Sequence, residues 1–179
     1  MENIELIPYR KGDKWGYSTP DKKILIECIY DWASPFSEGL GLVDVKGFSR
    51  FLNKKGDEVF RCAYSTVSSF SGELSEVRSN NKSGRINKSG ILVIPCKYSN
   101  FFKFSEGLAA VKEEIDYWFG YIDYTNNLQI PFKYENARAF SGGLAGVRIN
   151  NKWGFIDKNG NVIIQFIYDN IFDYFQNIN

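Results

Sequence analysis

The chain has 179 residues, of which 44% are hydrophobic and 17% aromatic, so it can bury a substantial core and is not a disordered chain. Its 22 basic and 21 acidic side chains leave a net charge of +1, which excludes a global electrostatic pull toward nucleic acid or an anionic membrane. Histidine is absent, and this excludes Ser-His-Asp and Cys-His catalysis as well as histidine-containing zinc sites.

Five similar segments follow one another along the chain. A tyrosine closes each segment, in steps of 34, 34, 36 and 34 residues, at Tyr30, Tyr64, Tyr98, Tyr134 and Tyr168. A fixed period of this size is typical of solenoids, propellers and other arrays. We therefore predict a single repeat domain over residues 1–179. Its repeats lie at about residues 1–35, 36–69, 70–103, 104–139 and 140–179.

Taken in chain order, the repeats differ at one dipeptide. The first repeat contains Trp15-Gly16, and the fifth contains Trp153-Gly154. The fourth repeat has Phe119-Gly120 at this place, after an insertion of two residues. The second and third repeats have Ser49-Arg50 and Ser83-Gly84 instead. For those two repeats we expect either looser packing or a groove over the open positions.

Each repeat is predicted to contain three short antiparallel strands, because segments rich in Val, Ile, Phe and Trp alternate with turn residues. In the fifth repeat these strands are Gly143–Arg148, Lys152–Asp157 and Asn161–Phe166. Asn150 and Asn151 supply the first hairpin turn, since asparagine tolerates the left-handed region, and Gly160 supplies the second. The connector Tyr168–Phe175 is expected to form an irregular turn or a single helical turn.

These patterns predict an all-β fold, an array of five three-stranded antiparallel repeats. One such sheet cannot bury both of its faces, so neighbouring repeats must stack on it. We favour an open curved solenoid, because a repeat of about 34 residues is short for a four-stranded propeller blade. A closed five-bladed propeller-like ring is the alternative.

The run Lys152–Asp157 (KWGFID), preceded by Phe140–Leu144 (FSGGL), resembles the bacterial WG-repeat family of KWG type. The resemblance covers nearly the whole chain as five copies. It is specific in the first, fourth and fifth repeats and degenerate in the second and third. The resemblance implies a β-rich repeat module without a generally assigned enzymatic activity, and it transfers no catalytic residue.

Three cysteines occupy one position of the repeat, at Cys28, Cys62 and Cys96, and Phe132 and Phe166 fill this position in the last two repeats. A position that alternates between cysteine and phenylalanine is typical of a core, because a free thiol behaves as a small hydrophobe. A three-thiolate metal site is the alternative. We predict no metal and no cofactor.

The location of the protein is predicted from the same thiols. An odd number of cysteines favours a reducing compartment, and the N-terminal residues lack the basic and apolar segments of a secretory signal. No apolar run is long enough for a transmembrane helix. We expect a cytoplasmic protein without membrane contact, although a secreted form with its signal removed would look the same.

Four residues that differ between repeats are the predicted partner contacts, because framework positions stabilise an array and copy-specific ones give it specificity. These residues are Trp32, Arg50, Arg85 and Trp118. A second candidate is a basic stripe at the end of each first strand, interrupted by Asp44. Its members are Arg10, Arg78, Lys112 and Arg148, and solvated strand ends are its alternative interpretation.

The insertion in the fourth repeat is acidic, with Glu113, Glu114 and Asp116. A hydrolytic carboxylate pair or a cation site is conceivable there, but we expect a solvated loop. The sequence therefore favours a non-enzymatic scaffold that binds a protein partner, in one form as an inhibitor or regulator of a larger cytoplasmic machine. A glycan- or cell-surface-binding module is the alternative. Nucleic acid is a disfavoured partner, and the oligomeric state is left open.

Overall fold

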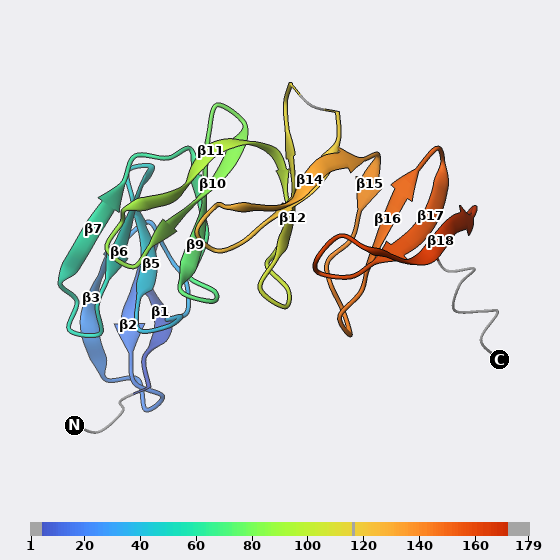
Figure 1. The fold of residues 1–179 in the computed structure, drawn as a ribbon. Coiled ribbons are helices and arrows are strands. Elements are labelled where there is room, and N and C mark those ends of the chain that lie inside the picture. Colours follow the sequence, from blue (N-terminus) through green and yellow to red (C-terminus); the bar gives the residue numbers. More distant parts are fainter. Residues whose placement is uncertain (1–4, 116, 172–179) are drawn as a thin grey trace. The chain divides into compact units, whose positions relative to one another are not determined.

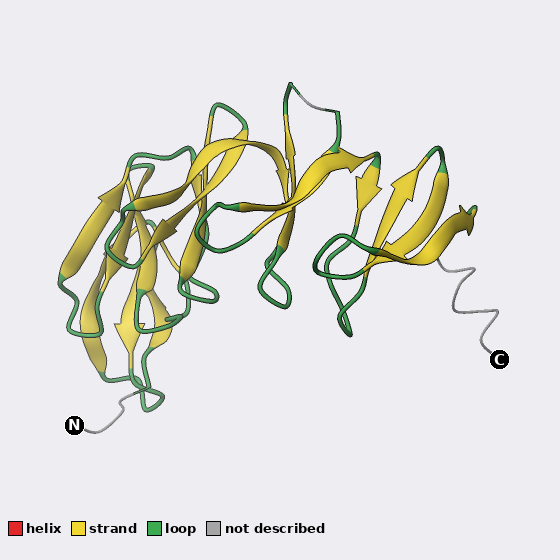
Figure 2. Cartoon of the chain, in the orientation of Figure 1, coloured by secondary structure: helices red, strands yellow, loops and turns green. Residues whose placement is uncertain are grey.

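The computed structural model describes residues 5–115 and 117–171. Every regular element in this part of the chain is a strand (Figure 2), and none of the described residues forms a helix that could cross a bilayer. The described residues form two compact halves. The first half contains those up to Asn80 together with Gly84–Val93, and the second contains Asn81–Ser83 and those from Ile94 onward.

The first half holds two complete sheets and the beginning of the third repeat (Figure 1). The first sheet has the order β1 (Ile7–Lys11), β2 (Lys14–Ser18), β3 (Ile24–Tyr30). The second has the order β4 (Trp32–Ala33), β5 (Gly41–Val45), β6 (Phe48–Leu52), β7 (Glu58–Cys62). The third repeat begins with the antiparallel pair β8 (Thr66–Val67) and β9 (Leu74–Ser79).

The boundary between the halves runs through β10 (Lys82–Asn87) and β11 (Leu92–Phe101). In the second half the last residues of β11 pair with β12 (Ala109–Glu113), which is followed by β13 (Phe119–Ile122) and β14 (Leu128–Tyr134). The final sheet has the order β15 (Asn136–Ala137), β16 (Ala145–Ile149), β17 (Lys152–Ile156), β18 (Val162–Tyr168).

The all-β fold of five antiparallel repeats is confirmed, and one feature of the sheets was not predicted. The connectors after the first, second and fourth repeats each form a two-residue strand, β4, β8 and β15, that pairs with the next repeat. The sheets of the second and fifth repeats are therefore four-stranded, and the third and fourth repeats share one seven-stranded sheet, β8–β14. For the connector after the fifth repeat, residues 172–175 lie outside the described residues. No described sheet closes into a barrel, in agreement with an open solenoid-like β-repeat fold.

The turns follow the predicted chemistry. Asn150 and Asn151 have φ angles of 49° and 60°, both in the left-handed region that a two-residue hairpin of type I′ requires. In the second turn, the side-chain oxygen of Asp157 accepts hydrogen bonds from the backbone N–H groups of Asn159 and Asn161, at 2.9 and 2.8 Å. These turns place β16, β17 and β18 side by side.

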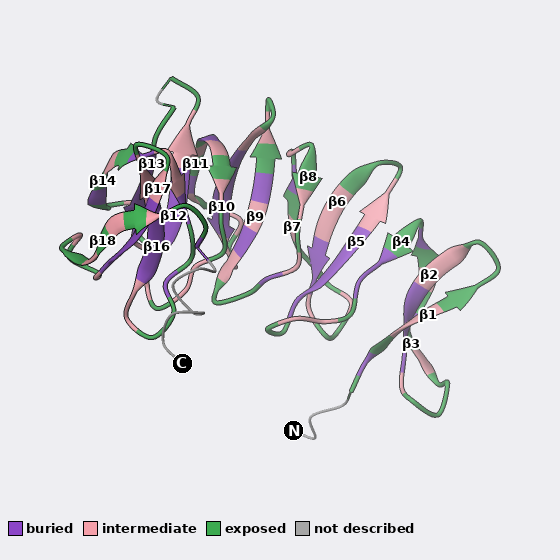
Figure 3. Cartoon of the chain, turned by 90° about the vertical axis from the view of Figure 1, so that its right-hand side faces the viewer, coloured by how far each residue is buried: buried purple, intermediate pink, exposed green. Residues whose placement is uncertain are grey.

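Buried residues recur along the middle of each sheet, as the purple segments of Figure 3 show for β5 and β16. An aromatic residue in the second strand of a repeat packs on the phenylalanine that opens the next repeat. The ring centroids are 4.6 Å apart for Tyr17 and Phe36, and 5.0 Å apart for Tyr121 and Phe140. These ring pairs are the cores of the repeat junctions.

Polar contacts between successive FSxGL motifs reinforce the junctions. The Ser37 hydroxyl donates a hydrogen bond to the Phe70 carbonyl at 2.7 Å, and the Glu38 carboxylate accepts one from the Gly72 N–H at 2.6 Å. In the second half, Glu106 accepts a hydrogen bond from the Gly143 N–H at 3.1 Å. The motif therefore joins one repeat to the next.

Candidate functional site

The glycine of the Trp-Gly pair has a steric role. A Cβ atom at Gly154 would lie 2.6 Å from the Ile164 carbonyl oxygen, and one at Gly120 would lie 2.7 Å from that of Ile130. Both distances are too short for a real contact. The ladder between the second and third strands shifts register at this point, between Trp153 and Phe155 in the fifth repeat. Glycine thus allows an irregular third strand to press on the second strand.

The second repeat lacks this irregularity because it lacks the glycine. Arg50 stands in the glycine position, and its side chain forbids the close backbone approach. The ladder there runs in register through three successive pairs, Ser49 with Cys62, Arg50 with Arg61 and Phe51 with Phe60. The sequence change from Trp-Gly to Ser-Arg thereby straightens the edge of the second sheet.

A pocket of about 510 Å³ lies at this straightened edge. It is lined by Val45, Lys46, Phe48, Arg50, Arg61, Cys62 and Ala63. We call it the basic-apolar pocket. It lies in one of the two repeats that lack the Trp-Gly pair, but it is not the groove expected over the tryptophan position, because Ser49 is not part of its lining. Its volume lies in the range of ligand-binding pockets.

The lining of the basic-apolar pocket contains three cations and no carboxylate. Arg50 and Arg61 share one carboxylate just outside the lining, that of Glu58, at 2.8 and 2.5 Å. The hydrogen bond from Arg61 is the largest of the effects that lower the pKa of Glu58. The Lys46 ammonium group forms no ion pair within the described residues, although its backbone N–H donates to Asp31 at 2.6 Å. The lining is therefore cationic, and two carboxylates, Glu58 and Asp31, lie beside it.

Phe48 is an exposed wall of the pocket, with 63% of its surface accessible. Its repeat position is held by lysine in the first, third and fifth repeats and by Trp118 in the fourth. In the fifth repeat, Lys152 pairs there with Asp169 at 2.6 Å. The second repeat has Ser65 where the fifth has Asp169, so neither partner of that ion pair is present. An exposed aromatic ring stands at this place in the second and fourth repeats, and our partner predictions included Trp118 but missed Phe48. Comparison of the lysine positions across the repeats would have found it.

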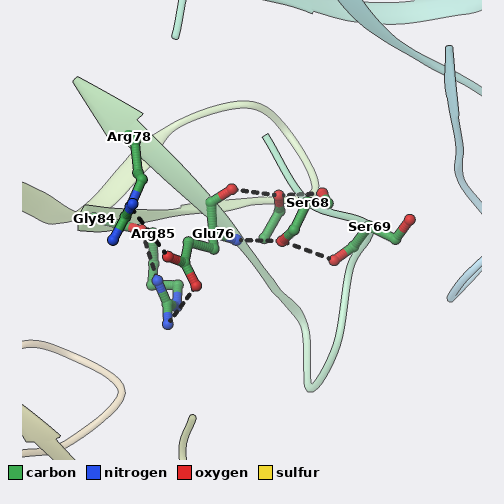
Figure 4. Close-up of polar contacts among 7 residues, drawn as sticks. Ser68, Ser69, Glu76, Arg78, Gly84 and Arg85 are labelled. Atoms are coloured by element: carbon green, nitrogen blue, oxygen red, sulfur yellow. Dashed lines mark hydrogen bonds and ion pairs between the residues drawn. The ribbon is translucent and has the colours of Figure 1, made fainter. Parts of the chain in front are cut away.

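A second copy-specific site is the polar cluster of the third repeat, shown in Figure 4. Arg85 occupies the second-strand position that aromatic residues hold in the other repeats, and it is only 5% exposed. Its guanidinium forms an ion pair with Glu76 at 3.4 Å and donates to the Gly84 carbonyl at 3.0 Å. Burial lowers the pKa of Arg85, and Glu76 opposes this effect. The side-chain oxygen of Ser68 accepts a hydrogen bond from the Glu76 N–H at 2.9 Å.

The four predicted partner residues do not share one face. Trp32 pairs with Asp44 and is 45% exposed, whereas Arg50 pairs with Val43. Because adjacent positions of a strand point to opposite faces, Trp32 and Arg50 lie on opposite faces of the second sheet. Arg85 is buried in its ion pair, so it offers little surface to a partner.

Trp118, the fourth predicted partner residue, belongs to the second half and is 42% exposed. Beside it in the insertion, Tyr117 is also exposed. Partner contact by the four residues stays a prediction, and for Arg85 it would need a partner that reaches the ion pair.

The basic-stripe residues each have a local partner. Arg10 lies 5.8 Å from the Trp15 ring centroid, and Lys112 lies 5.7 Å from that of Phe119. Arg78 pairs with Glu76 at 3.8 Å, and Arg148 with Glu135 at 3.2 Å. Each of these contacts gives the charged group a partner within the protein. They favour a structural role, while the nucleic-acid alternative stays a disfavoured prediction.

The three thiols are free. Cys62 is buried, and its burial raises the pKa of the thiol to about 11, whereas Cys28 and Cys96 are partly exposed. No group of three or more metal-ligating side chains occurs among the described residues. In the acidic insertion, Glu113 pairs with Lys97 and Glu114 with Lys82. Asp116 lies outside the described residues.

The fold and its repeated junctions define the class of this protein, an all-β array of short antiparallel repeats joined by aromatic pairs. The family model described as WG containing repeat matches residues 15–47, 50–82, 84–117, 119–153 and 153–178. The chain therefore belongs to the WG-repeat family, as the resemblance predicted.

No curated protein matches the chain. Among solved structures, it is similar to a protein of unknown function from Bacteroides caccae, with 12% identity and a TM-score of 0.36 over 91% of this chain and 72% of that one. It is also similar to a catalytically inactive variant of virginiamycin B lyase from Staphylococcus aureus with quinupristin. There the identity is 16% and the TM-score 0.38, over 93% of this chain and 58% of the other. Likenesses at these scores carry no argument about function.

Proposed function

We propose that this protein is a non-enzymatic binding module that holds a protein partner. One observation carries the proposal: aromatic residues at framework positions are mostly buried, whereas the copy-specific ones face solvent. Tyr17 and Phe51 are fully buried, while Trp32, Phe48 and Trp118 are exposed. Tryptophan is enriched at binding hot spots, and exposed apolar rings cost solvation free energy that partner contact recovers.

The absence of histidine from the sequence supports a function without turnover. So does the chemistry of the candidate site, whose arginines are held by Glu58 and whose thiol at Cys62 has a raised pKa. A thiolate, not a thiol, is the reactive species. Within this proposal the partner is a larger cytoplasmic machine that the module inhibits or regulates.

The test is a cross-linking pull-down with the tagged full chain, followed by identification of the cross-linked protein. Trp32→Ala combined with Trp118→Ala should keep the fold and weaken capture of that partner by at least about tenfold, the scale of a modest hot spot. Ile29→Ser and Ile167→Ser are matched controls, because both isoleucines are exposed. Capture that is equal for the parent and the double tryptophan variant contradicts this assignment.

A glycan-binding function is the second candidate, and the observation that favours it is again the exposure of Trp32 and Trp118. Aromatic rings provide flat apolar surfaces on which the apolar faces of sugars can stack. A glycan array separates the two candidates. Saturable binding of one glycan class, lost in the double tryptophan variant, supports the glycan function and contradicts the protein-binding one.

A further inference from the structure

The basic-apolar pocket combines two chemistries in one small volume. Its floor and walls include the aliphatic and aromatic side chains of Val45, Phe48 and Ala63, and cations of Lys46 and Arg61 share the same lining. Apolar walls favour an apolar group that leaves water, and the cations favour anions beside it. A linear ligand that carries both an apolar group and neighbouring anions satisfies both preferences. A small ion or a plain hydrocarbon satisfies one of them.

We infer that the pocket binds an acidic peptide segment that inserts one apolar side chain between carboxylates. This inference rests on the proposed protein-binding function and names the chemistry of the partner. The apolar anchor packs on the exposed ring of Phe48 and on Val45, and the flanking carboxylates meet Lys46 and Arg61.

Charge complementarity decides for an acidic partner over a basic or neutral one. The lining holds three cations and no carboxylate, and two carboxylates lie beside it: Glu58, which pairs with both arginines, and Asp31, which accepts the Lys46 N–H. A basic peptide would face net repulsion.

Two residue differences make the pocket specific to the second repeat. In the first and fifth repeats a lysine and a glycine stand where the second repeat has Phe48 and Arg50. The glycine admits the irregular third strand that presses on the second strand. A peptide that recognises Phe48 together with Arg50 would therefore bind at one repeat and not along the array.

The experiment measures fluorescence anisotropy of labelled peptides mixed with the full chain. The probe has the core Asp-Glu-Phe-Glu-Asp. A second peptide replaces the central phenylalanine by glycine, and a third replaces all four acidic residues by lysine. The probe should bind saturably, and each of the other peptides should bind more weakly by about tenfold or more. Binding of the probe should weaken with added salt.

Matched variants locate the binding. Phe48→Ser should remove the preference for the phenylalanine peptide over the glycine peptide, while Ile29→Ser, at a residue of similar exposure, should not. Lys46→Gln with Arg61→Gln should remove the preference for acidic peptides. Lys11→Gln with Lys22→Gln changes charge by the same amount at exposed positions outside the pocket and should leave that preference intact. Circular dichroism checks that each variant is folded.

Two results overturn the inference. The first is the absence of saturable binding of the probe by the parent, and the second is unchanged binding in the folded pocket variants. Failure of this inference is distinct from failure of the proposed function. A partner captured through Trp32 and Trp118, with equal yield from the parent and the pocket variants, contradicts the acidic-peptide pocket alone. Capture of no partner, together with binding of a glycan, contradicts the proposed function.

Discussion

At the scale of single residues, small side-chain differences decide how the strands of one repeat meet. Gly154 has no Cβ, and the carbonyl oxygen of Ile164 lies where that atom would be. Arg50 carries a long side chain at the same repeat position, and its strand pairs in register with β7 from Ser49 to Phe51, with a shift only after Phe51. The residue at this position thus determines how closely the third strand of a repeat approaches the second strand.

Gly154→Ala is expected to destabilise the protein by about 1–3 kcal/mol, the usual cost of forcing extra atoms into a packed site. The Ile164 carbonyl belongs to the backbone and cannot rotate away. Chemical denaturation measures the free energy of unfolding of both proteins. Arg50→Ala is the control, since it adds no atom and should cost no more than an exposed ion pair, about 1 kcal/mol or less. Equal losses for the two variants would contradict the steric role of the glycine.

Asp123 provides a pH-dependent turn. Burial opposes its ionisation, but hydrogen bonds led by the Asn127 N–H outweigh burial and lower the pKa of the carboxyl to about 2. The ordinary pKa of aspartate is about 3.9. Because the folded-state pKa is the lower one, the stabilisation is present above about pH 4 and is lost as the pH falls toward about 2.

Asp123→Asn is expected to lower the free energy of unfolding at neutral pH and to have little effect near pH 2, as measured by denaturation at both pH values. The fold should survive, because Asn53 and Asn87 make the same turn in the second and third repeats. The Asn53 side-chain oxygen accepts from the Lys55 N–H at 2.8 Å. A difference between parent and variant that stays constant with pH would exclude Asp123 as the titrating group.

At the scale of strands and repeats, the third repeat fills its core with different residues from the others. Arg85 and Glu76 occupy positions where the fourth repeat has Tyr121 and Ala110, which are directly paired. A charged pair therefore replaces an aromatic–aliphatic pair. A buried ion pair is costly to break by removing one partner, yet its replacement by apolar residues is often neutral or stabilising.

The double change Arg85→Tyr with Glu76→Ala copies the fourth repeat and is expected to leave stability unchanged or raise it. Arg85→Tyr alone should cost about 1 kcal/mol, because the partly exposed Glu76 then loses its ion pair with Arg85 and keeps the longer one with Arg78, at 3.8 Å. Thermal unfolding of the two single variants and the double variant forms a cycle that isolates the coupling. Additive effects would mean that the two residues stabilise the repeat independently.

The FSEGL motif leads to a second prediction, about the contacts between the fourth and fifth repeats. The Lys158 ammonium group and the Gly143 N–H both contact Glu106 and lower the pKa of its carboxyl. Glu106→Gln should therefore weaken this joint at neutral pH and not below the folded-state pKa of Glu106, where the parent is protonated as well. Hydrogen exchange of the Gly143 amide should be faster in the variant at neutral pH, and unchanged exchange would contradict the joint.

At the scale of the whole molecule, equivalent residues of successive repeats lie on different strands, and Cys28, Cys62 and Cys96 belong to β3, β7 and β11 of three different sheets. We therefore expect the three thiols to hold no common metal ion. Equivalent residues are therefore separated along the array, and each repeat carries its own side-chain differences.

The native protein is accordingly expected to contain no stoichiometric zinc when its metal content is measured. Cys62 should react with a thiol reagent far more slowly than Cys28 or Cys96, because it is 6% exposed and its thiol pKa is about 11. Mass spectrometry after timed labelling reads out each site. In denaturant the three should react at similar rates, and fast labelling of native Cys62 would contradict the core role of its position.

The sequence by itself determined the period, the all-β class, the turns and most core positions, because each depends on local chemistry repeated five times. It also named Arg50 as a copy-specific residue. Only the tertiary structure decided that Arg85 is buried, that Trp32 and Arg50 lie on opposite faces, and that Phe48, Lys46 and Arg61 share a pocket. Those features depend on strand register and on how closely neighbouring backbones approach. Residues on both strands determine them together, so the sequence of one strand does not reveal them.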